Sequence, residues 1–258
     1  TVSPNYAKEI TTLDYGEMLD ELLRERRSRQ HGVLNGIDYD VFNPETNVNL
    51  KRNYSVNDID ARADNKLELQ GRFGLKPDKE AFTVGIVARL IEQKGLDLLF
   101  PVAERLLKEL NFQLVVLGTG DSKYMSFFQE LEKKFSGQVA ANLTFDKALP
   151  HLVYAGADAV LIPSRFEPSG LSQMEAMRYG AVPIVRKTGG LADSVEDYNP
   201  KTASGTGFVF SEFDAMSMVI ALTRAFEIYR NTREWRELQR RCMKRDFSWS
   251  KSANEYAR

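Results

Sequence analysis

The sequence predicts a protein of the α/β class, built on a doubly wound parallel β-sheet. Two observations lead to this prediction. From residue 82 onward, short apolar runs alternate with longer amphipathic segments, the pattern of repeated strand–helix–strand units. The run at residues 157–162 is almost continuously apolar, which is typical of a strand covered on both faces. Regular strand–helix–strand succession predicts a single parallel sheet whose connections are right-handed.

The individual elements follow from this alternation. Residues 1–30 are predicted to form an appendage that ends in a charged helix, residues 33–38 a short strand and turn, and residues 58–73 a helical stretch. Strands are predicted at residues 82–87, 113–117, 139–145, 157–162, 182–185 and 207–210. Helices are predicted at residues 96–110, 124–135, 147–155, 170–179, 191–195, 214–229 and 232–243. Ligands of such sheets bind outside the carboxyl ends of the strands, so residues that follow strands are the candidates for function.

The composition is that of an ordinary globular protein and excludes several classes of function. Hydrophobic residues make up 43% of the chain and charged residues 28%. A net charge of −1 gives no electrostatic reason to expect nucleic acid or an anionic membrane as partner. The single cysteine, Cys242, excludes an internal disulfide and fits a reducing compartment, and two histidines leave little room for a zinc site. We therefore predict no metal. No transmembrane-length apolar run or signal peptide is visible.

The most informative segment is residues 163–180, which follow the apolar run at 157–162. Glu167 lies at the predicted strand end, and Glu175 lies eight residues later, about one turn into the next helix. Between them, the backbone N–H groups of Gly170, Leu171 and Ser172 open a helix N-terminus, which favours a phosphate. Two carboxylates on either side of a diphosphate-binding helix N-terminus suit a nucleotide-sugar, because one can contact the sugar and the other the ribose hydroxyls. The alternative is a surface strand–turn–helix with two solvated glutamates.

Glu167 and Glu175 match the E-x7-E signature of retaining GT-B glycosyltransferases. Residues 164–173 (SRFEPSGLSQ) resemble, in particular, the bacterial glycogen synthase and plant starch synthase family. The resemblance extends over almost the whole chain through residues 32–38 (GVLNGID), 42–44 (FNP), 88–97 (ARLIEQKGLD), 186–193 (RKTGGLAD) and 246–249 (DFSW). It implies a Rossmann-like domain that forms the C-terminal half of a GT-B fold.

Arg89 and Lys94 flank the loop after the first central strand, where two cations can neutralise a diphosphate as it leaves. The resemblance implies the same role for these two positions. It also implies that Glu167 supports the transferring glucose and that Glu175 contacts the ribose. Many bacterial glycogen synthases carry tyrosine or another residue at the position of Glu175, which leaves the form of the ribose contact open. The alternative for the two cations is an ordinary surface pair.

Further donor contacts are implied at positions that have simpler interpretations as well. Phe145 matches an aromatic residue that stacks on adenine, but a core aromatic at a strand end is also possible. Asn35 matches a sugar-contacting asparagine, although Asn-Gly is a turn former by itself. Ser169 replaces the usual cysteine and keeps a small polar side chain. Gly118 closes the second strand with a turn that lets backbone approach a nucleotide.

Two further observations complete the set. Thr188, Gly189 and Gly190 offer backbone donors for the phosphates or the sugar. His151 is predicted to be a helix or core histidine and not a catalytic residue.

The resemblance implies an ADP-glucose-dependent α-1,4-glucan synthase, with glycogen or starch as product and no cofactor beyond the donor. Residues 1–30 would be the end of an N-terminal domain, 31–245 the nucleotide-sugar-binding domain, and 246–258 a segment that returns toward the N-terminal domain. The chain is then expected to be a fragment that needs that domain for the glucan acceptor and for full activity. The protein would lie in the cytoplasm of a bacterium or in a plant plastid. A UDP-glucose-dependent GT-B transferase and a degenerate, non-catalytic donor-binding domain stay open as alternatives.

Overall fold

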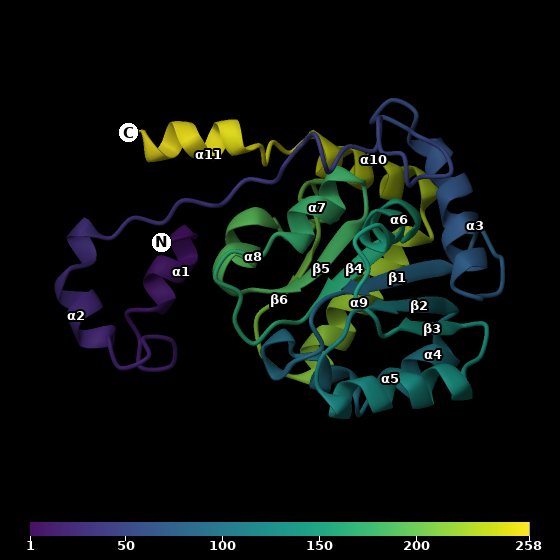
Figure 1. Cartoon of the computed structure of the whole chain (residues 1–258), viewed down its shortest axis with the longest axis horizontal. Helices are drawn as coiled ribbons and strands as arrows, with labels where there is room; N and C mark the ends of the chain where they lie inside the picture. The colour runs from purple at the N-terminus through teal and green to yellow at the C-terminus, as the bar shows by residue number, and fades with distance from the viewer. Residues whose placement is uncertain (258) are drawn as a thin grey trace.

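The computed structural model describes residues 1–257 and contains a six-stranded parallel sheet (Figure 1). Its strands are β1 (Phe82–Val87), β2 (Phe112–Leu117), β3 (Val139–Asn142), β4 (Ala159–Ile162), β5 (Val182–Arg186) and β6 (Phe208–Phe210). They lie in the order β3-β2-β1-β4-β5-β6, and every pairing is parallel. The predicted doubly wound α/β architecture is confirmed, with the strand order reversing between β1 and β4.

Helices cover both faces of this sheet (Figure 1). They are α3 (Arg62–Arg72), α4 (Ala103–Glu109), α5 (Ser122–Lys134), α6 (Leu149–Gly156), α7 (Ser172–Arg178), α8 (Gly189–Ser194), α9 (Ala215–Tyr229) and α10 (Thr232–Lys244). Alternate residues of β2 face opposite layers: Leu114 and Val116 pack in the core with α4, α5 and α9, whereas Val115 packs with α3 and α6.

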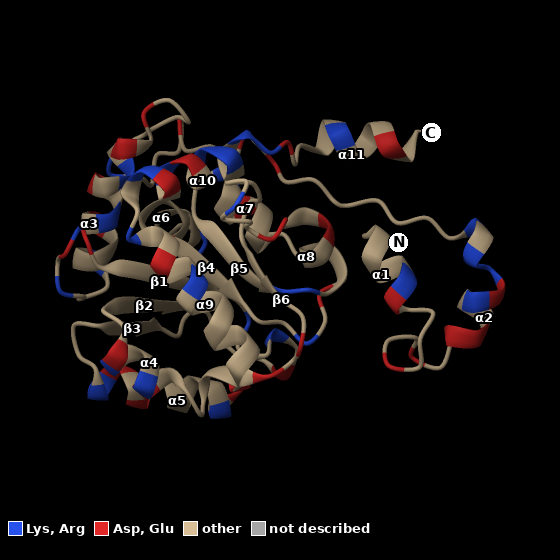
Figure 2. Ribbon diagram, turned by 180° about the vertical axis from the view of Figure 1, so that it is seen from behind, with Lys and Arg blue, Asp and Glu red and all other residues tan. Residues whose placement is uncertain are grey.

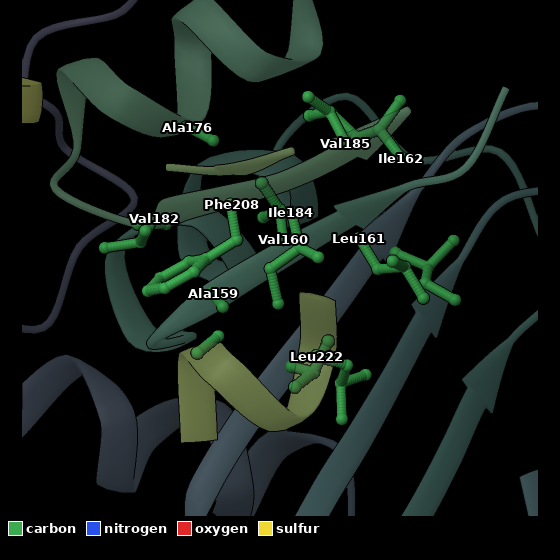
Figure 3. Close-up of a cluster of buried hydrophobic side chains, with 14 of the residues drawn as sticks. Ala159, Val160, Leu161, Ile162, Ala176, Val182, Ile184, Val185, Phe208 and Leu222 are labelled. Carbon is green, nitrogen blue, oxygen red and sulfur yellow. The ribbon is translucent and has the colours of Figure 1, made fainter. Parts of the chain in front are cut away.

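The centre of the core lies around β4 and β5 (Figure 3). All four residues of β4 are buried, and Phe208 of β6 and Leu222 of α9 pack beside them. This two-sided burial explains why the β4 sequence is a continuous apolar run instead of an alternating one.

Three predicted boundaries are wrong for identifiable reasons. The helix expected at 96–110 is divided into a 3₁₀ turn (Leu96–Leu99) and α4, because Pro101 has no N–H and restricts the residue before it. The strand expected at 139–145 ends at Asn142, whose side chain accepts hydrogen bonds from Thr144 and turns the chain. Residues 33–38 form no strand, only an isolated bridge between Ile37 and Ser248.

The two ends of the chain lie together on one side of the domain (Figure 1). Near the N-terminus are α1 (Pro4–Glu9), α2 (Asp20–Glu25) and a 3₁₀ turn (Arg27–Arg29), and near the C-terminus is α11 (Trp249–Tyr256). Helix α1 packs on α8, where Ser3 Oγ donates a 2.5 Å hydrogen bond to Asp193. Across residues 1–257, no helix combines the length and apolar character needed to span a membrane.

Candidate functional site

A cavity of about 400 Å³ opens at the carboxyl ends of β1, β2 and β4, where the strand order reverses. Most of the residues singled out in the sequence meet there. The predicted site residues that line it are Arg89, Lys94, Gly118, Phe145, Glu167, Gly170, Leu171, Ser172 and Glu175. The sequence blocks that follow β1 and β4 therefore form one binding pocket.

The charged centre of this cavity is an ion pair between Lys94 and Glu167. Lys94 Nζ lies 2.5 Å from Glu167 Oε2, and both side chains are largely buried. The hydroxyl of Ser164 donates a second hydrogen bond to the same carboxylate oxygen at 3.0 Å. Because Lys94 carries three N–H donors, it can hold Glu167 and still offer donors to a bound anion.

Main-chain contacts fix the distance between these two groups. The loop of Lys94 lies against the chain that leaves β4, and the N–H of Arg165 donates to the carbonyl of Gln93 at 2.8 Å. Gly95 adopts a positive φ of 64°, and a Cβ there would lie 2.0 Å from the carbonyl oxygen of Pro163. Only glycine permits this approach, so the loop that carries Lys94 is held firmly beside the loop that carries Glu167.

A row of free N–H groups lies next to the ion pair. Helix α7 begins at Ser172, and within residues 1–257 the N–H groups of Gly170, Leu171 and Ser172 have no hydrogen-bond partner. Gly170 has a φ of 64°, which turns the chain into the helix. Arg89 is exposed at the same edge and has no ion-pair partner among the described residues. Together these donors form a positive surface that suits phosphate groups.

Glu175 also lines the cavity and is held by a residue that the sequence analysis missed. The hydroxyl of Tyr154, on α6, donates to Glu175 Oε2 at 3.0 Å. Burial raises the pKa of Glu175 to about 7, and the hydrogen bond from Tyr154 opposes part of that rise. Glu175 therefore titrates near neutral pH. The sequence could have identified Tyr154 by its position three residues after His151 on the same helix, because this spacing places both side chains on the face toward the cavity.

Phe145 lies in the loop between β3 and α6, and 77% of its surface is exposed. This exposure excludes the core-aromatic interpretation, because an exposed ring at the wall of a cavity does not pack the core. Asp146 fixes the loop by accepting hydrogen bonds from the N–H groups of Ala148 and Leu149 at 2.7 and 2.9 Å. The ring is left with a free face for stacking.

Five predicted donor-binding residues do not line this cavity: Asn35, Ser169, Thr188, Gly189 and Gly190. Asn35 lies on the linker between the 3₁₀ turn and the domain, and Gly36 beside it packs on the backbone of Trp249. The Oγ of Ser169 is buried and has no partner within residues 1–257.

The Thr-Gly-Gly segment has a different use from the predicted one. Glu9 Oε1 accepts hydrogen bonds from Thr188 Oγ1 at 3.0 Å and from the N–H of Gly189 at 2.9 Å. The N–H of Gly190 donates to the carbonyl of Glu167 at 2.9 Å. In this structure the segment supports the Glu167 loop, and the N–H groups of Gly189 and Gly190 are already paired and are not offered to the cavity. The partner, Glu9, is too distant in sequence for local patterns to predict it.

His151 is buried, as predicted for a core histidine, and its Nδ1 lies 3.0 Å from the hydroxyl of Tyr179. Burial lowers its pKa, so the ring is neutral at physiological pH. It forms part of the floor of the cavity together with Phe42. Within the described residues, no group of three or more His, Cys, Asp and Glu side chains is placed to hold a metal ion.

Comparison with known proteins agrees with this geometry. Residues 70–244 match the family described as "Glycosyl transferases group 1". The whole chain is 46% identical to a glycogen synthase of Thermosipho africanus, of which it covers 53%, and 44% identical over 99% of its length to glycogen synthase 1 of Synechocystis. Its fold matches the catalytic domain of starch synthase IV from Arabidopsis thaliana, solved with ADP and acarbose, with a TM-score of 0.93 and 39% identity. That match covers 100% of this chain and 54% of the starch synthase. The chain thus spans about half the length of these relatives.

Proposed function

This chain belongs to the group 1 glycosyl transferase family, and we propose that it is the donor-binding part of an α-1,4-glucan synthase that takes glucose from ADP-glucose. The observation that carries the proposal is the single cavity that holds the Lys94–Glu167 pair, the free N–H groups of residues 170–172 and the exposed ring of Phe145. A nucleotide-sugar has a diphosphate, a sugar and a base that match these three features.

The cations act on the leaving group. As the bond between glucose and diphosphate breaks, negative charge grows on the departing ADP and positive charge grows at the sugar carbon. Lys94, Arg89 and the N-terminal end of α7 stabilise the diphosphate. Lys94 is held by Glu167, and the N–H groups of residues 170–172 are held by the backbone, before ADP-glucose binds. Little reorganisation of these groups therefore accompanies the charge change.

Glu167 lies on the other side of Lys94 and faces the same cavity. Its carboxylate hydrogen-bonds the hydroxyls of the transferring glucose and stabilises the cationic character that develops on the ring. Ser164 and Lys94 hold the carboxylate in one orientation, which keeps the carboxylate in place while the bond breaks.

The glucan acceptor enters from a second domain that faces this pocket in the whole protein. Exposed apolar residues lie on the terminal segments beside the domain: Met18 and Leu19 come just before α2, and Trp249 begins α11 (Figure 1). We therefore expect the present chain to bind the donor but to transfer glucose poorly without that partner domain. Homologous bacterial glycogen synthases make the cytoplasm the expected location.

The test is calorimetric titration of the chain with ADP-glucose, UDP-glucose and ADP. Saturable binding of ADP-glucose and ADP is expected, with Lys94→Ala weakening both by at least about tenfold, as for loss of one charge-assisted hydrogen bond. Lys108→Ala, an exposed lysine of α4, is the matched control and should bind as the unaltered chain does. Preference for UDP-glucose would leave the glycosyltransferase proposal standing and would reject ADP-glucose as the sugar donor. Absence of binding to all three nucleotides would reject the donor-site proposal for this chain.

A further inference from the structure

Helices α6 and α7 lie side by side and contribute one wall of the donor pocket (Figure 2). Two polar pairs join them. The hydroxyl of Tyr154 donates to Glu175 Oε2 at 3.0 Å, and His151 Nδ1 lies 3.0 Å from the hydroxyl of Tyr179. His151, Tyr154 and Glu175 line the cavity, whereas Tyr179 is fully buried. This wall therefore presents polar side chains to the cavity from two helices.

The hydrogen-bond partners of Tyr179 fix the direction of its proton. Asn47 Oδ1 accepts from the N–H of Asn49 at 2.8 Å, so the amide nitrogen of Asn47 faces Tyr179 and donates to its hydroxyl oxygen at 2.8 Å. Burial raises the pKa of Tyr179, so the hydroxyl keeps its single proton. Because the one acceptor near this hydroxyl within residues 1–257 is His151 Nδ1, the proton points to the histidine ring.

This network assigns the tautomer of His151. Burial lowers the pKa of the ring and keeps it neutral, and with Nδ1 accepting, the ring proton lies on Nε2. Nε2 has no hydrogen-bond partner among the described residues. Unlike the enclosed unpaired atoms, such as Ser169 Oγ, it retains accessible surface, and His151 lines the cavity. The cavity wall therefore contains an oriented N–H group that is free to bind a ligand.

A free acceptor lies on the same wall. Glu175 uses Oε2 to accept from Tyr154, while Oε1 has no partner in the part of the chain that the structure describes and also retains accessible surface. One free N–H and one free carboxylate oxygen suit a pair of neighbouring hydroxyl groups, because every hydroxyl both donates and accepts. They suit a phosphate poorly, since a carboxylate repels an anion.

We propose that His151 is a nucleotide-binding residue, whose Nε2–H donates to a ribose hydroxyl beside Glu175. The inference rests on the proposed function, because a nucleotide-sugar is what brings a ribose into this pocket. Lys94 and the N–H groups of residues 170–172 bind the diphosphate, and Phe145 stacks on the base. The ribose joins these two parts of the nucleotide, and the wall formed by α6 and α7 is the part of the cavity that remains for it.

Two substitutions separate the two nitrogens of the ring. His151→Asn places Oδ1 near the position of Nδ1, so Tyr179 keeps an acceptor while the N–H toward the cavity is lost. His151→Gln places an amide N–H near the position of Nε2 and keeps that group. ADP binding, measured by calorimetry, should weaken about three- to tenfold in His151→Asn and stay within about twofold of the unaltered chain in His151→Gln. Equal losses in the two variants would assign His151 to packing and overturn the proposal.

Deoxynucleotides identify the group that His151 contacts. 2′-Deoxy-ADP and 3′-deoxy-ADP each lack one ribose hydroxyl. One of the two should bind the unaltered chain and His151→Asn equally well, because the contact is then already missing from the ligand. If His151→Asn weakens the binding of ADP and of both deoxynucleotides by the same factor, the ring does not contact the ribose and the proposal is overturned.

The tautomer can be measured without a substitution in the pocket. The chain has two histidines, and His31 is exposed, so His31→Gln leaves His151 as the sole histidine. Long-range ¹H–¹⁵N NMR spectra should show a protonated Nε2 whose resonance shifts when ADP is added. A proton on Nδ1 would overturn the proposal. Absence of ADP binding by the unaltered chain would reject the donor site and this inference with it, whereas unchanged ADP affinity in His151→Asn would reject the inference alone.

Discussion

Tyr154 and Glu175 form a partly buried hydrogen bond of 3.0 Å in the wall of the proposed donor pocket, with the tyrosine hydroxyl donating the proton. Burial favours the neutral form of the carboxyl and raises its pKa to about 7. The pocket therefore contains one carboxyl group that titrates near neutral pH, Glu175, and a second, Glu167, that is held in an ion pair with Lys94. The two glutamates of the signature thus have different partners, a tyrosine hydroxyl for Glu175 and a lysine ammonium group for Glu167.

The raised pKa of Glu175 predicts a pH dependence of stability. The unfolded carboxyl titrates near 4.5 and the folded one near 7, so the folded state binds the proton more tightly between these values. The stabilisation from this group is complete below about pH 4.5 and is lost as pH rises through about 7, by roughly 3 kcal/mol in total.

Urea unfolding of the unaltered chain and of Glu175→Gln, at pH 5 and pH 8, measures this difference. The variant should lose less stability between the two pH values than the unaltered chain does, and equal losses would contradict the assignment. Tyr154→Phe is a useful companion, because removal of the donated hydrogen bond should raise the pKa of Glu175 further.

Glu167→Gln separates the sugar contact from the phosphate contact. The substitution keeps the size of the side chain but frees Lys94 from its ion pair, so ADP should bind about as well as before or up to about threefold more tightly, within the range of surface and partly buried pairs. The additional affinity for ADP-glucose over ADP should disappear, because the amide no longer offers a charged acceptor to the glucose. Calorimetric titration with ADP and with ADP-glucose measures both affinities. A loss of ADP binding itself would show that Glu167 contributes to the nucleotide contact and not to the glucose contact.

Phe145 should contribute to binding and not to stability. Stacking of one base on an aromatic ring is worth about 1–3 kcal/mol, so Phe145→Ala should weaken ADP binding at least about fivefold. Since 77% of the residue is exposed, the free energy of unfolding should change by less than about 0.5 kcal/mol. Phe145→Tyr, which keeps the ring face, is the control. If Phe145→Ala binds ADP like the unaltered chain, the ring of Phe145 does not stack on the adenine base.

Gly190 and Gly71 form a matched pair of glycines for testing the support of the Glu167 loop. A Cβ at Gly190 would lie 1.7 Å from the carbonyl oxygen of Ser169, whereas a Cβ at Gly71, in α3, meets nothing within 4 Å. Gly190→Ala should destabilise the protein by about 1–3 kcal/mol and weaken ADP-glucose binding, because the loop must move. Gly71→Ala should stabilise the helix by about 0.5–1 kcal/mol. Thermal unfolding and ADP-glucose titration of both variants test this contrast.

The parallel sheet could be predicted because its strands are continuous apolar runs, of which residues 159–162 are the clearest, and because helices separate them regularly. The meeting of Lys94 and Glu167 at the carboxyl edge of the sheet could also be predicted, since both lie in segments that follow strands. The early end of β3 was missed because Leu143 and Phe145 continue the apolar pattern, while the side chain of Asn142 turns the chain.

The contacts that sequence reasoning missed join residues far apart in the chain. Tyr154 and Glu175 lie on different helices, and Glu9 reaches Thr188 and Gly189 across most of the protein. Periodicity and spacing carry information within an element and its neighbours, and they do not show which helix packs on which. The change of role for the Thr-Gly-Gly segment has this origin.

The close approach of Gly95 to the carbonyl of Pro163 has a consequence for how the pocket can vary among related proteins. The spacing of the Lys94 and Glu167 loops is fixed by backbone meeting backbone, so it does not depend on the side chains that face the ligand. We expect substitutions at Phe145 or Glu175 to alter which nucleotide is preferred while the width of the pocket stays the same. With the spacing of these loops fixed by the backbone, the proposed preference for one nucleotide could change through side chains alone, without refolding of the loops.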